Sequence, residues 1–307
     1  MAVCKLCKID KDLIDSHIIP HFVIEWLRKT SPTGYMRDVI NPNKRIQDSV
    51  KLKLLCRDCE VLLSKDEKKF SEIIFRPYVD TELSEKGSAT GVIKEFKYDQ
   101  WLLRFIISVH WRILVKERED LSKSLSSYQL KVIDLKLEVW RKFILFELDS
   151  TGPQKSYLIF LQSFREGKGN LILKLNERID IYILRSIDGT SVFTSKTLGV
   201  FAKFGPVVAY TTILPDELKG ISDAKLKKNG AIKTAQSLSN DDLLRFILID
   251  RPNETLALTK VSKKQNDVID RDLRKNPEKV FKSLAFASEE TRRRIKHLKS
   301  IDSGHDA

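Results

Sequence analysis

Apolar residues recur at helical spacing in several stretches of the chain. In the first, Phe22 and Trp26 are four residues apart, and the preceding Pro20 suits the first turn of a helix. One helix, 98–119, carries apolar residues on more than one face and is predicted to be buried. The predicted helices cover residues 20–29, the segment from 58 onward, 98–119, 125–146 and most of the chain beyond 241.

Two extended segments, 35–40 and 45–55, flank the sequence Asn-Pro-Asn-Lys at residues 41–44. Asparagine and proline favour turns, through side-chain hydrogen bonding and a fixed backbone angle respectively. A β-hairpin is therefore predicted, and its second strand leads directly to Cys56.

Beyond residues 151–153 the pattern changes to short apolar runs separated by glycine-bearing turns, which is typical of strands. We expect these strands to form a mainly antiparallel sheet. Together with the helices they predict the α+β class. The predicted strands are residues 157–164, 171–175, 179–184, 191–193 and 200–214.

The charge of the chain is strongly positive and unevenly distributed. Among its 307 residues, 42% are hydrophobic, which is enough for a sizeable core, and the formal net charge is +13. Residues 1–100 carry 18 basic and 16 acidic side chains, a net charge of +2, so most of the excess lies further along the chain. A polyanionic partner such as nucleic acid would be held mainly by that later part.

The sequence contains no segment typical of secretion or membrane insertion. Its N-terminus lacks a basic region followed by an apolar core, and the longest apolar run, 101–115, is interrupted by Arg104, His110 and Arg112. We therefore expect a cytoplasmic protein with no membrane partner. His110 lies on the apolar helix, where core packing is the favoured role.

The four cysteines form two C-x-x-C pairs, Cys4 with Cys7 and Cys56 with Cys59. Each pair can present two thiolates to one ion, and a tetrahedral zinc site needs four ligands. Two redox pairs or four separate surface thiols are the alternatives. In a reducing compartment the pattern favours a structural zinc ion, whose closed thiolate shell leaves no position for water or substrate.

Residues 16–20, Ser-His-Ile-Ile-Pro, lie between the two pairs, and residues 54–60, Leu-Leu-Cys-Arg-Asp-Cys-Glu, contain the second pair. In this combination and order, residues 4–75 resemble the HNH family of nucleases. Members of that family often hold a ββα-metal fold with two C-x-x-C pairs and carry the active histidine between them. The resemblance implies an N-terminal domain of treble-clef type, with the order knuckle, hairpin, helix.

By this resemblance, His17 is the general base that deprotonates a water molecule for attack on a phosphodiester bond. A neutral imidazole, with an ordinary pKa of about 6.5, accepts such a proton at physiological pH. A magnesium or manganese ion would polarise the phosphate and stabilise the leaving oxygen. The alternative is that His17 caps or supports the junction of strand and helix. His21, four residues later, is expected to be a surface or junction residue.

The remaining family positions match less closely. Ser16 stands where the family often has a metal-binding Asp or His. Asn43, favoured over Asn41, would be the central asparagine of the family's site. Glu60 aligns with the last ligand, and Glu67 is its alternate, since a carboxylate can bind a hard divalent cation. A turn asparagine and solvated glutamates are the competing interpretations.

Basic residues cluster near the C-terminus, where they could neutralise several phosphates. Cations at the end of a helix also complement its dipole, so this cluster has a second explanation. Residues 225–228, Lys-Leu-Lys-Lys, are another candidate for phosphate contact. The proposed nucleic-acid-binding residues are Arg292, Arg293, Arg294 and Lys296.

These observations predict two domains, with the polar segment 81–91 as a linker. Residues 1–80 form a zinc-stabilised HNH-like nuclease domain, and residues 92–307 form a domain of helices and sheet that binds nucleic acid or a partner protein, or senses a signal. The expected activity is metal-dependent cleavage of nucleic acid, with DNA favoured, as in effectors of bacterial restriction or anti-phage systems. The alternative is a non-catalytic treble-clef scaffold that binds nucleic acid or a partner protein.

Overall fold

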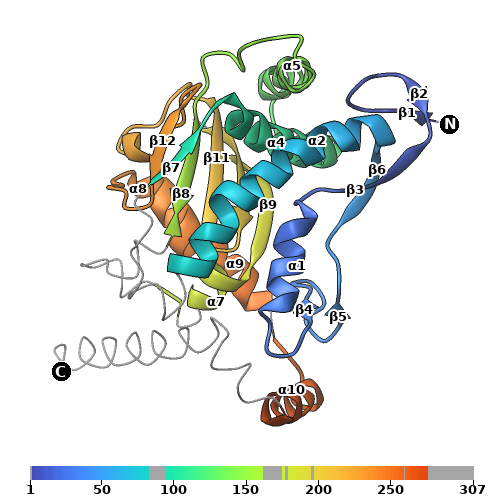
Figure 1. Cartoon of the computed structure of the whole chain (residues 1–307), viewed down its shortest axis with the longest axis vertical. Coiled ribbons are helices and arrows are strands. Elements are labelled where there is room, and N and C mark those ends of the chain that lie inside the picture. The colour runs from blue at the N-terminus through green and yellow to red at the C-terminus, as the bar shows by residue number, and fades with distance from the viewer. Residues whose placement is uncertain are drawn as a thin grey trace. The chain divides into compact units, whose positions relative to one another are not determined.

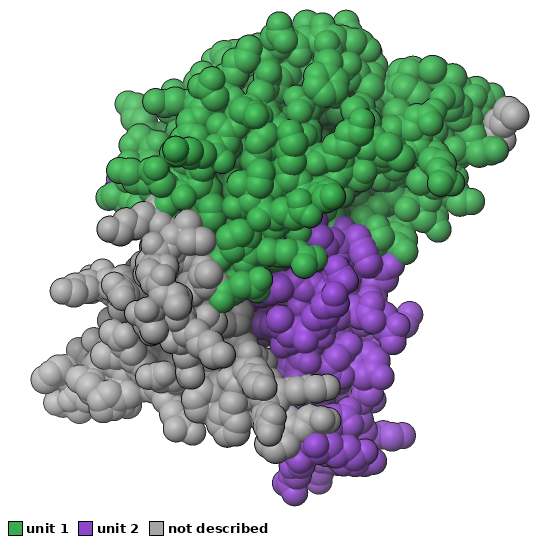
Figure 2. Space-filling view, viewed as in Figure 1, with its two compact units in different colours: residues 1–20, 49–160, 187–238 green, residues 21–48, 161–186, 239–307 purple. Residues whose placement is uncertain are grey.

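The computed structural model divides the chain into two compact units (Figure 2). Unit 1 consists of Met1–Pro20, Ser49–Phe160 and Ile187–Leu238, and unit 2 of His21–Asp48, Leu161–Ser186 and Ser239–Ala307. Helices and antiparallel strands both contribute, so the α+β class predicted from the sequence is confirmed. The structure describes residues 2–82, 95–161, 175–176, 179–194, 197–258 and 260–275.

The N-terminal part of unit 1 consists of a turn that carries Cys4 and Cys7, an antiparallel strand pair and a helix. Strand β1 (Ala2–Val3) pairs antiparallel with β2 (Asp10–Lys11), and β3 (Leu13–His17) pairs antiparallel with β6 (Lys51–Cys56). Helix α2 (Arg57–Phe70) begins at the residue that follows β6. The predicted cysteine turn and helix are observed, whereas the strand that leads to Cys56 pairs with β3 and not with the segment 35–40.

Two long helices follow in unit 1, α4 (Gln100–Leu121) and α5 (Ser127–Ile144). Both begin at a capping residue: the Asp99 side chain accepts a hydrogen bond from the N–H of Trp101, and Ser126 forms a capping box. Burial of α4 on several faces confirms the expectation from its sequence. The other helical segments of unit 1 are η1 (Ser71–Phe75), η2 (Tyr78–Glu82) and η4 (Ser222–Ala224).

The main sheet of unit 1 has four antiparallel strands in the order β8 (Ser156–Phe160), β11 (Val207–Leu214), β10 (Leu198–Phe204) and β9 (Ile187–Phe193) (Figure 1). All residues of β8 and β10 are buried, and α4 contacts the sheet. The predicted antiparallel sheet is thus observed. A separate two-stranded sheet pairs β7 (Glu95–Tyr98) with β12 (Gly230–Lys233).

Aromatic rings join the first helix of unit 1 to its sheet. The rings of Phe70 in α2 and Phe105 in α4 stack with centroids 4.2 Å apart. Phe204 in β10 lies 5.6 Å from the Phe70 ring and 5.7 Å from the Phe105 ring. Such contacts fix α2 against the rest of the unit, because large buried rings dominate the energetics of packing.

Unit 2 contains α1 (His21–Lys29) and the short hairpin of β4 (Met36–Arg37) with β5 (Arg45–Ile46). The predicted helix is confirmed, and Val23, Ile24, Trp26 and Leu27 form its buried face, whereas Phe22 is only half-buried. The other helices of unit 2 are α7 (Ile179–Arg185), α8 (Asp241–Arg245), η5 (Phe246–Asp250), α9 (Arg251–Leu258) and α10 (Lys263–Lys275).

The predicted strand 179–184 is wrong, because these residues form helix α7. Three isoleucines within six residues favour a strand by propensity. However, Ile179 is buried together with Tyr182, Ile183 and Leu184, three to five residues further on, whereas Ile181 is 37% exposed. The burial therefore follows a helical period, and packing decides the structure over propensity.

Two predicted strands are divided in the structure. The segment 45–55 becomes β5, which forms the predicted hairpin with β4, and β6, which pairs with β3 instead. The segment 200–214 is broken at Gly205, whose positive φ of 57° allows the tight turn between β10 and β11. In both cases one predicted strand becomes two, and each of the two has an antiparallel partner.

Part of the predicted organisation lies outside the described residues, including strand residues 171–174 and the chain beyond 275. The proposed linker 81–91 lies outside the described residues from residue 83 onward. The division into domains 1–80 and 92–307 stays a prediction. Unit 1 itself contains α2 and α4, one from each side of that division. Among the described helices, none combines the length and apolar character needed to cross a membrane.

Replacing Phe105 with Ala should lower the free energy of unfolding by about 3–5 kcal/mol, since it leaves a cavity between Phe70 and Phe204. Denaturant titration of the purified variant measures this change. The control is Tyr128→Ala, because Tyr128 is 66% exposed; its effect should stay within about 0.5 kcal/mol. Equal effects of the two substitutions would contradict the packing described for Phe105.

Candidate functional site

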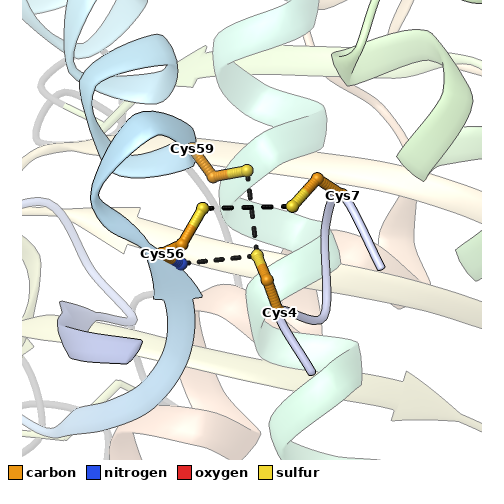
Figure 3. A group of neighbouring side chains, drawn as sticks. All are labelled: Cys4, Cys7, Cys56 and Cys59. Carbon is orange, nitrogen blue, oxygen red and sulfur yellow. Dashed lines mark hydrogen bonds between the residues drawn. The ribbon is translucent and has the colours of Figure 1, made fainter. Parts of the chain in front are cut away.

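The four cysteines converge on one point in unit 1 (Figure 3). Cys4 and Cys7 come from the turn between β1 and β2, Cys56 ends β6, and Cys59 lies in the first turn of α2. The Sγ atoms of Cys4 and Cys59 are 3.7 Å apart, and those of Cys7 and Cys56 are 3.9 Å apart. All four sulfur atoms lie within 4.8 Å of one another.

Backbone hydrogen bonds shape the turn that presents Cys4 and Cys7. The N–H of Cys4 donates to the carbonyl of Ile9 at 3.0 Å, and the N–H of Lys8 donates to the carbonyl of Cys4 at 2.9 Å. Lys8 adopts a positive φ of 62°, which closes the turn. The N–H of Cys56 donates to the Sγ of Cys4 at 3.3 Å, so the second pair is linked to the first.

This sulfur arrangement fits a tetrahedral metal ion. With metal–sulfur bonds of about 2.3 Å, as for zinc, the edge of a tetrahedron is about 3.8 Å. The separations of 3.7 Å between Cys4 and Cys59 and 3.9 Å between Cys7 and Cys56 match that edge. They are far longer than a disulfide bond of about 2.05 Å, and all four cysteines are free. The four side chains can therefore hold a metal ion.

Burial and backbone hydrogen bonds act in opposite directions on the pKa of Cys4. Burial raises the pKa of Cys7 and of Cys59. At Cys4 burial is outweighed by hydrogen bonds from backbone groups, first that of Cys56, which lower its pKa to about 7. A bound cation would favour the thiolate form at all four positions, because metal coordination removes the thiol proton.

His17 is the last residue of β3, where it pairs with Lys51 of β6. Its backbone carbonyl accepts a hydrogen bond of 2.7 Å from the Nη1 of Arg112. Its imidazole is half-buried. The strand therefore ends at a fixed position, from which the His17 side chain remains accessible.

Arg112 in α4 holds this junction in place although its side chain is only 1% exposed. Its Nη2 donates to the Oε1 of Glu67 in α2 at 2.6 Å, and its Nε donates to the carbonyl of Ser108 at 3.3 Å. One buried guanidinium thus joins β3, α2 and α4. Glu67, the alternate metal ligand expected from the sequence, is engaged in this ion pair.

Glu60 and Ser16 differ in their capacity to bind a ligand. The Oε1 of Glu60 is buried and has no hydrogen-bond partner among the described residues. Ser16 is completely buried, and its hydroxyl donates to the carbonyl of Ile14 at 3.5 Å. Glu60 therefore offers an uncommitted carboxylate oxygen, whereas the hydroxyl of Ser16 faces the interior of the protein.

Asn43 belongs to unit 2, in the loop between β4 and β5. Its Oδ1 accepts a hydrogen bond of 2.8 Å from the N–H of Ser262, just before α10. The side-chain oxygen thus has a structural role in joining this loop to the helix. Its catalytic role stays a prediction.

A second set of possible metal ligands in unit 2 was not expected from the sequence. His21 begins α1, and Asp48 follows β5; their candidate ligand atoms lie within 4.8 Å of each other. The two residues are 27 positions apart in the chain, and no short motif links them. Only the path of the chain between α1 and β5 brings them together.

The other candidate residues have ordinary surroundings or lie outside the described residues. His110 is a core residue, as expected: burial lowers its pKa to about 3, and its Nδ1 is 2.8 Å from the Oγ1 of Thr211. Lys225 forms an ion pair of 2.7 Å with Glu217. The residues outside the described part of the chain are Arg292, Arg293, Arg294 and Lys296.

A hollow of about 330 Å³ in unit 1 lies beside the cysteine turn. It is lined by Lys5 and Lys8 of that turn and by residues of α4 and α5, including Trp111, Arg118 and Arg141. Both arginines are engaged in ion pairs, with Asp134 and Glu138 respectively, so they are walls of the hollow rather than free donors.

Comparison with known proteins adds no relative to this picture. No protein-family model matches the chain, and neither a curated protein nor a solved structure matches it. The function has to be argued from the residues themselves.

Replacing Arg112 with Met should lower the free energy of unfolding by about 3 kcal/mol, because it leaves the Glu67 carboxylate without its buried partner. Chemical denaturation measures the loss. The matched control is Arg118→Met, whose partner Asp134 is 53% exposed; that change should cost about 1 kcal/mol or less. Similar losses for both variants would refute the anchoring role of Arg112.

Proposed function

We propose that this protein is a zinc-stabilised, metal-dependent endonuclease of the HNH type. The observation that carries the proposal is the arrangement of β3, β6 and α2. An antiparallel strand pair leads directly into a helix, His17 ends the first strand, and the four-cysteine cluster lies at the start of the helix. This is the order of the ββα-metal fold that the sequence resembles.

Zinc is the metal that best suits the cysteine cluster. Four thiolates at tetrahedral separation form a closed set of soft ligands, which favours zinc over hard cations. With every position taken by sulfur, such an ion stabilises the fold and takes no part in the reaction. Cleavage then requires a second, harder ion.

The proposed reaction is hydrolysis of a phosphodiester bond. His17 accepts a proton from the attacking water, whose oxygen bonds to phosphorus while the bond to the leaving oxygen breaks. The leaving oxygen departs with the electron pair and is then protonated. A magnesium or manganese ion, when bound, would polarise the phosphate and stabilise the negative charge of the leaving oxygen. The free Oε1 of Glu60 makes it a candidate ligand for that ion.

Nucleic acid, with DNA favoured, is the proposed substrate, and the net charge of +13 supports a polyanionic partner. A role as an effector of a bacterial restriction or anti-phage system rests on analogy with other proteins that join an HNH domain to a larger one. A partner protein that binds the larger part of the chain belongs to the same analogy.

A non-catalytic zinc scaffold is the second candidate, and two observations favour it. Ser16, in the position of a family metal ligand, is fully buried, and Glu67 is paired with Arg112. If Glu60 also fails to bind a cation, the nuclease site would be incomplete. The chain would then use its cysteine module to present a binding surface.

Metal analysis of the purified chain should find about one zinc ion per molecule. Cys56→Ser should abolish stoichiometric zinc and increase amide hydrogen exchange across residues 4–75, since structural zinc contributes directly to folding. The control is Ile9→Ser, because Ile9 is an exposed residue of the same turn; this variant should retain the metal. A stable wild type free of any metal would refute the zinc site.

Plasmid cleavage with Mg²⁺ or Mn²⁺ tests the nuclease. His17→Ala should slow nicking by about 10²–10⁴-fold, the usual contribution of a general base. Ile14→Ala, an exposed position on the same strand, should cleave like the wild type. Equal cleavage by His17→Ala would remove that residue from the mechanism, and no cleavage by the zinc-loaded wild type would favour the scaffold.

A further inference from the structure

We propose that His21 and Asp48 hold a divalent cation of the Mn²⁺ class, at a site distinct from the four cysteines. One imidazole nitrogen and one carboxylate oxygen, within 4.8 Å of each other, can be bridged by a single ion with bonds of about 2.0–2.2 Å. Both residues belong to unit 2, and the cysteines belong to unit 1.

The helix that carries His21 is firmly fixed within unit 2. Leu27 and three other residues of α1 are buried, and Arg185 of α7 holds the far end of the helix. The guanidinium of Arg185 donates to the Oγ1 of Thr30 at 2.6 Å and to the carbonyl of Leu27 at 2.9 Å. It also lies 5.5 Å from the ring centroid of Trp26. His21 therefore begins a helix that has little freedom to shift.

The loop that carries Asp48 is held by hydrogen bonds of its own. The Nη1 of Arg37 donates to the carbonyl of Pro42 at 2.7 Å, which spans the turn between β4 and β5. The guanidinium of Arg45 lies 4.7 Å from the ring centroid of Tyr35. These contacts give the segment 35–48 a defined conformation, although much of it is exposed.

Helix α10 and the residue before it also contact the segment 35–48. Arg45 forms an ion pair of 3.0 Å with Asp272, and both side chains are less than one-third exposed. The N–H of Ser262 donates to Asn43 at 2.8 Å. α10 has no buried residue, so it is attached by polar contacts rather than by an apolar face. We interpret it as a positioning element for the loop of Asp48.

The donor set decides which ion suits the site. Imidazole nitrogen and carboxylate oxygen are borderline to hard ligands, so together they accept Mn²⁺ and other divalent ions of the first transition row, whereas four thiolates select softer ions. Two protein ligands leave several positions for water or phosphate oxygens, as is usual where metal ions act on phosphate groups. An ion pair between Asp48 and the N-terminus of α1 is the competing explanation, since helix N-termini attract carboxylates.

The cation site stands without any nuclease activity. Its use in catalysis rests on the proposed function, in which cleavage requires a harder ion than the one held by the cysteines. The site would then supply the harder ion that cleavage requires, and Glu60 would not be needed for it.

Titration of the full-length, zinc-loaded protein with Mn²⁺, followed by the electron paramagnetic resonance signal of free Mn²⁺, tests the proposal directly. Binding of Mn²⁺ to the wild type should saturate at one ion per molecule. His21→Gln and Asp48→Asn should each weaken binding by about 100-fold, since each removes a ligand. Circular dichroism and zinc content establish that each variant is folded.

Two substitutions on α10 provide a matched pair. Asp272→Asn removes the partner of Arg45 and should weaken Mn²⁺ binding by about tenfold, the usual effect of losing a residue that orients a ligand. Asp270→Asn makes the same change of charge at an exposed position of the same helix and should bind like the wild type. The exchange Arg45→Asp with Asp272→Arg should recover part of the lost affinity.

Absence of saturable Mn²⁺ binding by the folded wild type would overturn the proposal, as would unchanged binding by both His21→Gln and Asp48→Asn. Equal weakening by Asp270→Asn and Asp48→Asn would also overturn it, because general electrostatics would then explain both. Mn²⁺ binding without plasmid cleavage would support the site while refuting the nuclease. Cleavage that persists in folded Asp48→Asn with unaltered metal dependence would support the nuclease and refute the use of this site in catalysis.

Discussion

Convergence of four thiol groups is the constraint on which the N-terminal part of this protein depends. The turn between β1 and β2 contributes two sulfur atoms, β6 one and α2 one, all within 4.8 Å. Strands β1 and β2 have only two residues each, and most of their side chains are exposed or half-buried. Such short strands bury too little apolar surface to stabilise a turn by themselves. A metal ion bound by the four thiolates would add the stability that this small apolar core does not provide. It would also fix the direction of α2 relative to β6.

Arg112 fixes the end of β3 through its hydrogen bonds. A buried guanidinium is costly unless its donors are satisfied, and here they reach Glu67 and the carbonyls of Ser108 and His17. Because these acceptors lie on α2, α4 and β3, the position of His17 is coupled to the packing of both helices. The stacking of Phe70 on Phe105 places α2 and α4 at the distance that this network needs. Polar and apolar contacts therefore act on the same pair of helices.

Local sequence patterns predict much of this arrangement. They do not predict contacts between residues that are far apart in the chain. Helical spacing located α1, α2, α4 and α5, and the paired C-x-x-C motifs predicted that the cysteines converge. Nothing in the sequence indicates that β6 pairs with β3, or that β7 pairs with β12 more than 130 residues later. The isoleucines of α7 led to a wrong strand prediction. Strand propensity is a local property, whereas the burial that favours the helix depends on the packing of the whole unit. Asp48 was missed for the same reason: its proximity to His21 depends on how the loop is folded.

The two proposed sets of metal ligands among the described residues differ in the ions that they bind. Thiolates retain soft ions and exclude water when all four positions are filled, whereas an imidazole with a carboxylate binds harder ions weakly and leaves positions open. The soft set lies in a short-stranded region with little core, where a tightly held ion has the most effect on stability. The open set lies in a loop fixed by the ion pair of Arg45 with Asp272, where an ion could exchange without unfolding the chain. For the proposed nuclease, this separation predicts that removing the weakly held ion lowers cleavage and spares the fold, while removing the thiolate-bound ion affects both.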